Sequence, residues 1–360
     1  MTGWLPSRSS LLTLTANEMP SQSRNDGQSG IALLIVLLTI TLLTIVVIEF
    51  TDFTQVETHL AFSARNALQA TYLARSGVNV AEALVIVDQQ IAPGNDSLQD
   101  VWAKPFPPLP IGDGTVAFRV RDEARFLNLN DMFSKDGYKL DDKVEVFTRL
   151  FTILGIDQRI LMAIVDWIDS NQDPELTPPG AEQPYYLGLT PPQTVRNGPL
   201  LTLREMLLVR GVTPTVLARL EGFVTVLPPD GLRVNINTAP PEVLYALSKG
   251  MLADPGVVDR LIASRDTEAF TSVSQTSLAA VTGLPDALLT NAAFLRPDSN
   301  YFRIEAVGEI NDVRRGIVEL VKRDGKRLTR VTWTPSSATL ALTSQLPSDF
   351  LATLPLLGDH

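Results

Sequence analysis

Gln28-Ser29-Gly30 is followed directly by Ile31-Ala32-Leu33-Leu34-Ile35-Val36-Leu37-Leu38. No charged residue occurs between Gln28 and Glu49. The 18 residues from Ile31 to Ile48 are all apolar or threonine. At about 1.5 Å per residue they cover roughly 27 Å, close to the hydrocarbon thickness of a bilayer. A secretory signal peptide has a shorter apolar region, followed by a small-x-small cleavage site. Residues 31–50 are therefore predicted to form a membrane-spanning helix, and a plain single-span anchor is one alternative for its role.

A small polar segment that ends in Gly, directly before a membrane helix, resembles the junction in prepilins, the precursors of bacterial type IV filament subunits. The resemblance implies that a prepilin peptidase cuts between Gly30 and Ile31 and that the new N-terminus is methylated. Residues 1–30 would then be a leader. Met19 is an alternative start to Met1 and would give a twelve-residue leader.

One position departs from the usual pilin pattern. Counted from Ile31, the fifth residue is Ile35, where most pilins and pseudopilins carry Glu. A carboxylate inside a membrane costs about 2.5–3.5 kcal/mol on insertion scales, so it persists only with a partner. A subunit without this acid has lost one pairing with its neighbour, which suits the end of a filament. K-type minor pseudopilins of the type II secretion system share the absence, and the resemblance implies a place at the filament tip.

The composition restricts the chemistry. The chain has no Cys, two His (His59 and His360) and a formal net charge of −10. Disulfides and thiolate sites are therefore excluded, and neither His lies near an obvious nucleophile, so we expect no enzymatic activity. The negative charge disfavours nonspecific binding to nucleic acid.

The pattern of apolar residues predicts an α+β fold with a pilin-like head. Apolar residues recur every three or four positions from Val56 to Leu84, and many small residues between Ala61 and Ala83 allow a sheet or other helices to approach closely. Alternating residues predict antiparallel strands at 115–121, 125–130, 301–307, 316–322 and 328–333. The predicted parts are a long N-terminal helix (31–92), a small sheet head (93–135 and 299–335), a large inserted all-helical domain (136–298) and a tail (336–360).

The predicted insert carries further resemblance to the K-type pseudopilins. The residues that carry it are Asp166-Trp167-Ile168-Asp169, Asp173, Gly180-Ala181-Glu182, Tyr185-Tyr186-Leu187-Gly188, Pro199 to Leu207 and Val234-Asn235-Ile236-Asn237-Thr238-Ala239. The resemblance implies a single-pass protein of the bacterial inner membrane, with its C-terminal region in the periplasm. It also implies a set of partners, namely other minor pseudopilins, the major pseudopilin, the prepilin peptidase, the inner-membrane secretion platform and exoprotein cargo.

Residues 160–195 contain five acids and no Lys or Arg. Asp166 and Asp169 would lie on one face at the C-terminal end of a helix, where the helix dipole is already negative. Six to eight oxygen ligands suit Ca²⁺, and the resemblance also implies calcium. We expect Asp169, Asp173 and Glu182 to be ligands, with Asp166 either a ligand or an orienting group. The spacing is not that of an EF-hand, and a solvated acidic loop is the alternative.

One part of the sequence also resembles a class of proteins with a different function, DNA binding. Residues 234–247, with Arg265 and Phe270, resemble the helix-hairpin-helix modules of membrane-anchored DNA receptors, so the insert is expected to be SAM/helix-hairpin-helix-like. A phosphate-binding hairpin needs free backbone amides and basic side chains. Residues 253–257 contain a Pro and an acid instead, and residues 235–295 hold three cations against six anions. This balance favours contact with proteins and no nucleic-acid partner.

Overall fold

The computed structural model describes residues 26–336 apart from 92, 230 and 284–291. Most of the predicted leader and almost all of the predicted tail lie outside these residues. The helices, 3-10 helices (η) and strands in chain order are α1 (Asp26–Ile91), η1 (Val101–Ala103), β1 (Leu109–Ile111), β2 (Gly114–Asp122), β3 (Leu127–Asn128), η2 (Leu129–Met132), α2 (Asp141–Ile153), α3 (Gln158–Ile168), α4 (Gln183–Leu187), η3 (Leu203–Leu208), α5 (Pro214–Leu220), β4 (Val224–Thr225), β5 (Val234–Asn235), α6 (Pro241–Leu247), α7 (Lys249–Ala253), α8 (Pro255–Thr267), α9 (Gln275–Thr282), η5 (Ala292–Phe294), β6 (Leu295–Arg296), β7 (Tyr301–Ile310), β8 (Val313–Asp324) and β9 (Arg327–Ser336).

Helix α1 is unbroken over 66 residues, which is about 100 Å at the rise of an α-helix. It begins in one structural unit, which ends at Ser63, and continues into a second unit that starts at Ala64. The side chains from Gly30 to Arg65 are exposed, and the apolar part of the helix is long enough to cross a membrane. The predicted long helix with an apolar N-terminal half is therefore confirmed.

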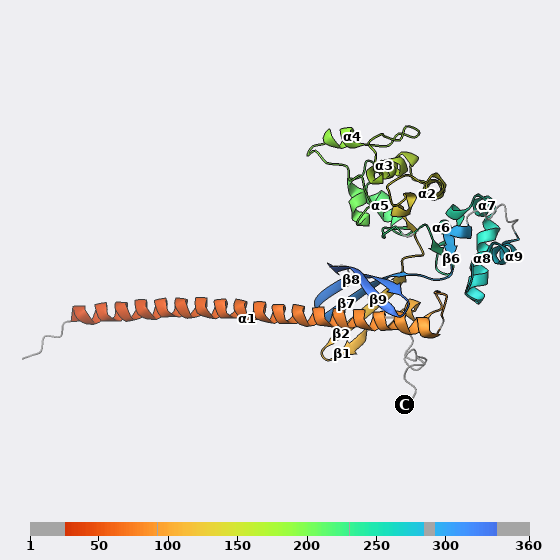
Figure 1. The fold of residues 1–360 in the computed structure, drawn as a ribbon. Helices are drawn as coiled ribbons and strands as arrows, with labels where there is room; N and C mark the ends of the chain where they lie inside the picture. The colour runs from red at the N-terminus through yellow and green to blue at the C-terminus, as the bar shows by residue number, and fades with distance from the viewer. Residues whose placement is uncertain (1–25, 92, 230, 284–291, 337–360) are drawn as a thin grey trace, which may run out of the picture. The chain divides into compact units, whose positions relative to one another are not determined.

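Five antiparallel strands in the order β1-β2-β7-β8-β9 form the sheet of the head (Figure 1). Strands β2 and β7 are direct neighbours although the whole insert separates them in the sequence. Asp122, the last residue of β2, lies opposite Phe302 near the start of β7. The predicted antiparallel sheet, interrupted by a helical insert, is thus confirmed.

The C-terminal part of α1 packs on this sheet at backbone distance. The side of the helix that faces the sheet is buried, and it consists of Ala70, Ala74, Gly77, Val78, Ala81, Leu84 and Val85. A Cβ atom at Gly308 of β7 would lie 2.1 Å from the carbonyl oxygen of Ala70. Such a contact is possible only for a residue without a side chain. The predicted role of the small residues, close approach of a sheet, is what the structure shows.

The second predicted strand was wrong. Of residues 125–130 only Leu127–Asn128 (β3) is extended, and it pairs in parallel with β4, outside the five-stranded sheet. The chain does not form a hairpin at Asp122-Glu123. Both side chains are buried there: Asp122 accepts from Asn235 and Thr238 of the insert, and Glu123 pairs with Arg303 of β7. The chain between β2 and β7 runs from Glu123 to Asn300, and the predicted insert, 136–298, lies within it. Strand β1, which the sequence did not predict, completes the head beside β2.

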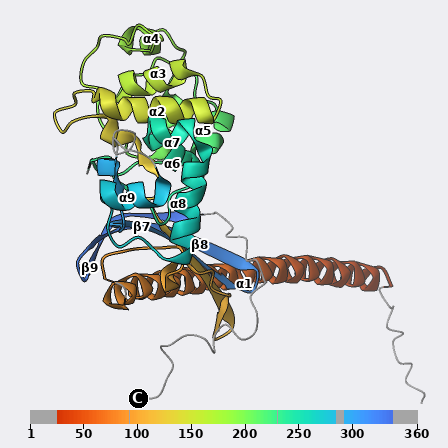
Figure 2. The ribbon, with the colours of Figure 1, turned by 90° about the vertical axis from the view of Figure 1, so that its right-hand side faces the viewer.

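Helices α2 to α9 form one group around an apolar core of their own (Figure 2). Phe147, Phe151, Leu161 and Tyr186 are among its largest fully buried side chains. Short segments such as α4 and α6 are stable only because this shared core buries their apolar sides. The insert is thus helical as predicted, with two short parallel strand pairs, β3–β4 and β5–β6, at its base.

A buried polar network joins the insert to the head. Asp122 accepts hydrogen bonds from the Asn235 side-chain amide at 2.9 Å and the Thr238 hydroxyl at 2.6 Å. The Asn237 amide donates to the carbonyl oxygens of Phe270 and Pro297 at 2.9 and 3.0 Å. The Asn235-Ile236-Asn237-Thr238 segment, whose pattern contributed to the family resemblance, is therefore a structural joint.

Candidate functional site

Helix α3 positions the acids that the sequence predicted to bind calcium. Asp157 caps its N-terminus and accepts a hydrogen bond from the backbone N–H of Arg159 at 2.8 Å. An apolar helix face then holds α3 in the core of the insert. Asp166 lies in the last turn, and Asp169 follows the helix end with extended backbone dihedrals.

Asp166, Asp169 and Glu182 form a group that we call the insert acidic cluster. One carboxylate oxygen of each residue lies within 4.8 Å of one from each of the others. Glu182 comes from a different element, since it caps the N-terminus of α4. The three residues are only 0–3% exposed. The end of α3 and the start of α4 therefore bring three carboxylates together inside the protein.

In this cluster each carboxylate has one bonded oxygen and one unbonded oxygen. Asp166 accepts from the backbone N–H of Glu175 at 3.1 Å, and Asp169 accepts from the Asn171 side-chain amide at 3.0 Å. Glu182 accepts from the Gln183 N–H at 3.2 Å. The other three oxygens, Asp166 Oδ2, Asp169 Oδ1 and Glu182 Oε1, are buried and have no hydrogen-bond partner among the described residues.

The pKa values reflect this uncompensated negative charge. Burial, followed by the charges of Glu182 and Asp166, raises the pKa of Asp169 to about 7. Burial and the charge of Asp166 likewise raise the pKa of Glu182 to about 7. Burial raises the pKa of Asp166 as well. These shifts favour protonation of the cluster, or a bound cation, near neutral pH.

Asp173, the remaining predicted ligand, does not belong to the cluster. It is exposed, and its backbone N–H donates to the Asn171 side chain at 2.6 Å. Its charge still contributes to the raised pKa of Glu182, although it is the smallest of the causes. Glu175, the fifth acid of the segment, pairs with Lys139 instead. The structure thus brings together three of the four predicted site residues.

The residues of the insert acidic cluster fit a calcium ion. Calcium prefers oxygen ligands at about 2.3–2.6 Å, so two of its ligands can be at most about 5 Å apart. One carboxylate oxygen from each residue meets this requirement, and each residue also has a buried oxygen without a hydrogen-bond partner among the described residues. Gly180, which sequence reasoning did not assign to the site, leaves room beside them: a Cβ there would lie 2.0 Å from Asp166 Oδ2.

The predicted processing residues all lie on α1. Gly30 and Ile31 are within the helix and exposed, and Ile35 is 55% exposed on the apolar part. The helix begins at Asp26, so the predicted cleavage junction lies inside α1 and does not directly precede it, unlike the predicted arrangement. The cleavage itself stays a prediction.

The three cations that a DNA-binding function would use are engaged within the protein. Arg265 is 7% exposed and donates to the carbonyl oxygens of Ile236 and Ala239, both at 2.8 Å. Arg260 donates to the carbonyl oxygen of Thr282 at 2.6 Å. Lys249 pairs with Glu145 at 3.2 Å. Arg265, which contributed to the helix-hairpin-helix resemblance, thus donates to the backbone of the insert.

Comparison with known proteins supports the same family as the sequence. Two family models, both described as type II secretion system (T2SS) protein K, match residues 125–229 and 234–293. Type II secretion system protein K of Aeromonas hydrophila is 32% identical over 317 residues, which are 82% of this chain and 92% of the relative. The protein of the same name from Pseudomonas aeruginosa is 29% identical over 83% of this chain and 91% of its own length.

A solved structure shows the same fold. The crystal structure of the GspK-GspI-GspJ complex from the enterotoxigenic Escherichia coli type 2 secretion system contains a chain that matches with a TM-score of 0.61. The two chains are 22% identical, and the match covers 77% of this chain and 99% of the other. These findings confirm the predicted family and give the DNA-binding alternative no support. The chain belongs to the type II secretion system protein K family.

Proposed function

We propose that the protein is a minor pseudopilin at the tip of the type II secretion pseudopilus. There it starts assembly together with other minor pseudopilins and helps to export folded exoproteins across the outer membrane. The observation that carries the tip position is Ile35, an apolar residue at the place where other subunits carry the acid that pairs with a neighbour. Without the acid, the subunit cannot make that pairing inside a filament.

The membrane helix defines the proposed location. The apolar part of α1 can span the bacterial inner membrane once, and the head and insert then lie in the periplasm. Family membership supports this placement, because the inner-membrane platform and the prepilin peptidase belong to the same secretion machinery. With no Cys and two His in the chain, the proposed role is assembly rather than catalysis.

The proposed partners are the other minor pseudopilins and the major pseudopilin. In the similar solved structure, GspK forms a complex with GspI and GspJ. In this chain, α1 exposes large apolar side chains beyond the predicted span, namely Phe53, Val56, Leu60 and Phe62, which are 54–65% exposed. We expect these side chains and the sheet head to contact the other subunits, which leaves the insert free to meet cargo.

Calcium is the proposed ligand of the insert acidic cluster. Asp166, Asp169 and Glu182 would each supply one oxygen, and backbone carbonyls and water would complete the shell. The unbonded buried oxygens support this assignment. Such an ion would hold the end of α3 to the start of α4.

Mass spectrometry of the protein from bacterial membranes tests the processing step. With a working prepilin peptidase, we expect Ile31 as the N-terminus, with a methylated amine. Gly30→Ala should leave the leader in place, because the peptidase needs a residue without a side chain there, whereas Ser29→Ala should be processed normally. An intact leader on the unaltered protein would show that it is a plain membrane anchor.

Immunogold labelling of overproduced pseudopili tests the tip position. We expect gold particles at one end of each filament, and no long filaments when this chain is overproduced alone. Labelling at regular intervals along the filament would place the protein in the shaft and contradict the proposal.

A further inference from the structure

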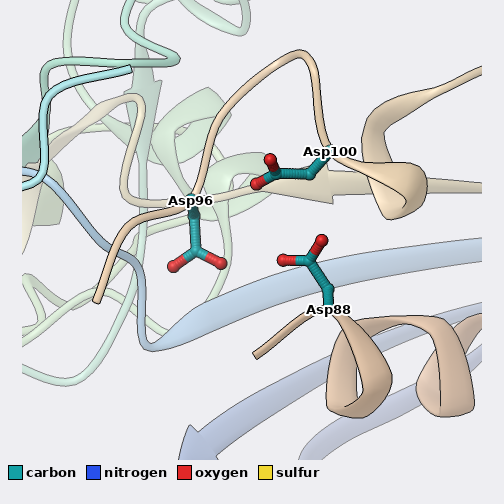
Figure 3. A group of neighbouring side chains, drawn as sticks. All are labelled: Asp88, Asp96 and Asp100. Atoms are coloured by element: carbon teal, nitrogen blue, oxygen red, sulfur yellow. The ribbon is translucent and has the colours of Figure 1, made fainter. Parts of the chain in front are cut away.

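A second group of carboxylates lies in the head, at the end of α1. Asp88, Asp96 and Asp100 each place one carboxylate oxygen within 4.8 Å of one from each of the others. Figure 3 shows the Asp88 carboxylate pointing from the helix toward the other two. We call this group the head acidic cluster. It shares no residue with the insert acidic cluster.

The head acidic cluster is inside the protein. Asp88 lies in the last turn of α1 and is 4% exposed, and Asp96 lies in the following loop and is 0% exposed. Asp100, directly before η1, is partly buried. Carboxylates at such positions lose most of their hydration, so each requires a hydrogen-bond donor or a cation.

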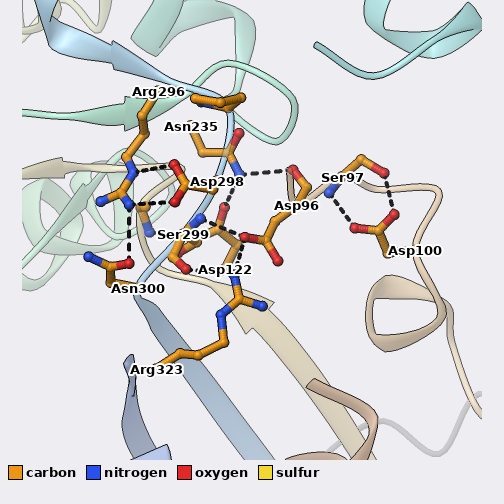
Figure 4. A network of polar contacts seen from close by, with 12 residues as sticks. Asp96, Ser97, Asp100, Asp122, Asn235, Arg296, Asp298, Ser299, Asn300 and Arg323 are labelled. Atoms are coloured by element: carbon orange, nitrogen blue, oxygen red, sulfur yellow. Dashed lines mark hydrogen bonds and ion pairs between the residues drawn. The ribbon is translucent and has the colours of Figure 1, made fainter. Parts of the chain in front are cut away.

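The hydrogen bonds of these residues leave two buried oxygens unbonded. Asp96 Oδ2 accepts from the Ser299 N–H at 2.6 Å and pairs with Arg323, as Figure 4 shows. Its Oδ1, like Asp88 Oδ2, is buried with no hydrogen-bond partner in the described part of the chain, although the Trp102 side chain lies close enough to Asp88 to lower its pKa. Both Asp100 oxygens accept from Ser97, at 2.6 Å from its N–H and 2.7 Å from its hydroxyl. Each Asp100 oxygen keeps a second lone pair.

One guanidinium does not balance the local charge. Arg323 is the cation paired with Asp96, yet, in addition to burial, the charges of Asp100 and Asp96 raise the pKa of Asp88, and the charge of Asp122 raises the pKa of Asp96. Burial, followed by the charges of Asp100 and Asp96, raises the pKa of Asp88 to about 7. Burial raises the pKa of Asp96 to about 6 against the opposing effect of Arg323. The cluster thus retains a deficit of positive charge.

The donor set selects the class of ligand. All three groups offer carboxylate oxygens, which are hard ligands and suit calcium or a similar divalent cation rather than a soft metal. The separation of up to 4.8 Å matches two oxygens on opposite sides of one such ion. We propose that Asp88, Asp96 and Asp100 form a second divalent-cation site, of the calcium class, in the sheet head.

An ion at this site would tie three parts of the molecule together. Asp88 belongs to α1, and Asp96 is held to β8 through Arg323 and to the segment before β7 through Ser299. The backbone carbonyl of Asp96 also accepts from the Asn235 amide at 3.0 Å, at the joint between head and insert. The ion therefore fixes the end of α1 against the point where the insert joins the sheet.

Calcium binding to the full-length chain in detergent tests the proposal. The background is the Asp169→Asn/Glu182→Gln variant, in which the insert acidic cluster has lost two carboxylates. Equilibrium dialysis with radioactive calcium should find one ion per chain in this background, and Asp88→Asn should remove it. Asp113→Asn, which changes an exposed acid in the same head, should retain the ion. No ion in the background, or an ion that survives both Asp88→Asn and Asp100→Asn, overturns the proposal.

Thermal unfolding provides a second test, because Asp88→Asn should change the melting temperature in opposite directions in chelator and in calcium. In chelator, Asp88→Asn should raise the melting temperature, because it removes one of the repelling charges. In calcium the same variant should melt lower than the unaltered chain, because it has lost the ion. A destabilisation of equal size in both conditions overturns the proposal. If the variants do not fold, crystals of the unaltered protein soaked in Mn²⁺ decide: an anomalous peak between the three carboxylates is expected, and its absence overturns the site.

Discussion

The two acidic clusters differ in how the negative charge of their buried carboxylates is compensated. In the insert, Asp166, Asp169 and Glu182 are buried together, and Lys139, whose charge lowers the pKa of Asp166, is paired with Glu175 outside the cluster. In the head, Asp96 is paired with Arg323, which is itself only 6% exposed. The head thus carries part of its compensating charge in the fold, whereas the insert depends on what it binds. The stability of the head cluster should therefore depend on the residue that supplies its cation, Arg323. The stability of the insert cluster should depend on calcium and on pH.

Removal of the built-in cation should have the largest effect. Arg323→Met leaves Asp96 buried without its partner, which typically destabilises a protein by about 3–5 kcal/mol. Urea unfolding in chelator measures this loss. Arg314→Met is the matched control, since Arg314 pairs with Glu309 on the surface of the same head and its loss should destabilise the protein far less. Equal losses in the two variants would mean that Arg323 does not compensate the head cluster.

The removal of calcium should have the second-largest effect on stability, chiefly in the insert. An ion that binds only the folded state at a hundredfold excess over its Kd stabilises by about 2.7 kcal/mol. Chelator should therefore speed hydrogen exchange of the amides in α3 and α4, measured by mass spectrometry. Asp169→Asn/Glu182→Gln should abolish the difference between calcium and chelator in these helices. If the exchange rates of the unaltered protein are the same in calcium and in chelator, the insert acidic cluster does not bind calcium.

The pH dependence should reveal the protons that replace the ion. The folded state raises the pKa of Asp169 and Glu182 to about 7, so between roughly pH 4.5 and 7 it binds more protons than the unfolded state. In chelator the free energy of unfolding should therefore fall as the pH rises through this range, by at most about 1.4 kcal/mol per pH unit for each proton. Asp88 and Asp96 contribute in the same direction.

The pH effect can be assigned to each cluster by mutation and by calcium. Asp169→Asn/Glu182→Gln should reduce the slope of stability against pH, and Asp88→Asn should reduce it separately. Calcium should flatten it, because a bound ion displaces the protons. A stability that instead rises with pH over this range in chelator would contradict the raised pKa values.

The smallest effect is expected at Asp173. This residue is exposed and stands apart from the oxygens of the cluster. Asp173→Asn should therefore change the free energy of unfolding by less than about 0.5 kcal/mol and leave the response to calcium intact. Thermal unfolding with and without calcium measures both. A lost calcium response would show that Asp173 moves into the cluster when the ion binds.

The sequence predicted the features that depend on local pattern. The apolar run after Gly30, the period of α1 and the alternation in β7, β8 and β9 each lie within one stretch of chain, and the structure contains all of them. The strand predicted at 125–130 was wrong for a tertiary reason. Alternation alone cannot distinguish an extended segment of the sheet from one that enters the core of the insert, as Leu127 does.

The two clusters also differ in whether a local sequence pattern could predict them. The acids of the insert cluster lie within one short segment, so counting charges was enough to find them. The head cluster depends on Arg323 and Ser299, which are more than 200 residues from Asp96. One local signal was present: Asp88 continues the buried side of α1 after Ala81, Leu84 and Val85. An acid at a core position of a helix requires a partner, and that pattern could have identified it.

The pairing of β2 with β7 has a consequence for how the protein folds and varies. Since Asp122 lies opposite Phe302, the insert is topologically the loop of a β-hairpin. The entropic cost of closing a loop rises only with the logarithm of its length, about 0.6 kcal/mol for each doubling. Replacing a short turn by a loop of this size therefore costs on the order of 3 kcal/mol. A cost this small lets a compact head carry a large independent core, and the two can change their sizes separately as long as the hairpin register is kept.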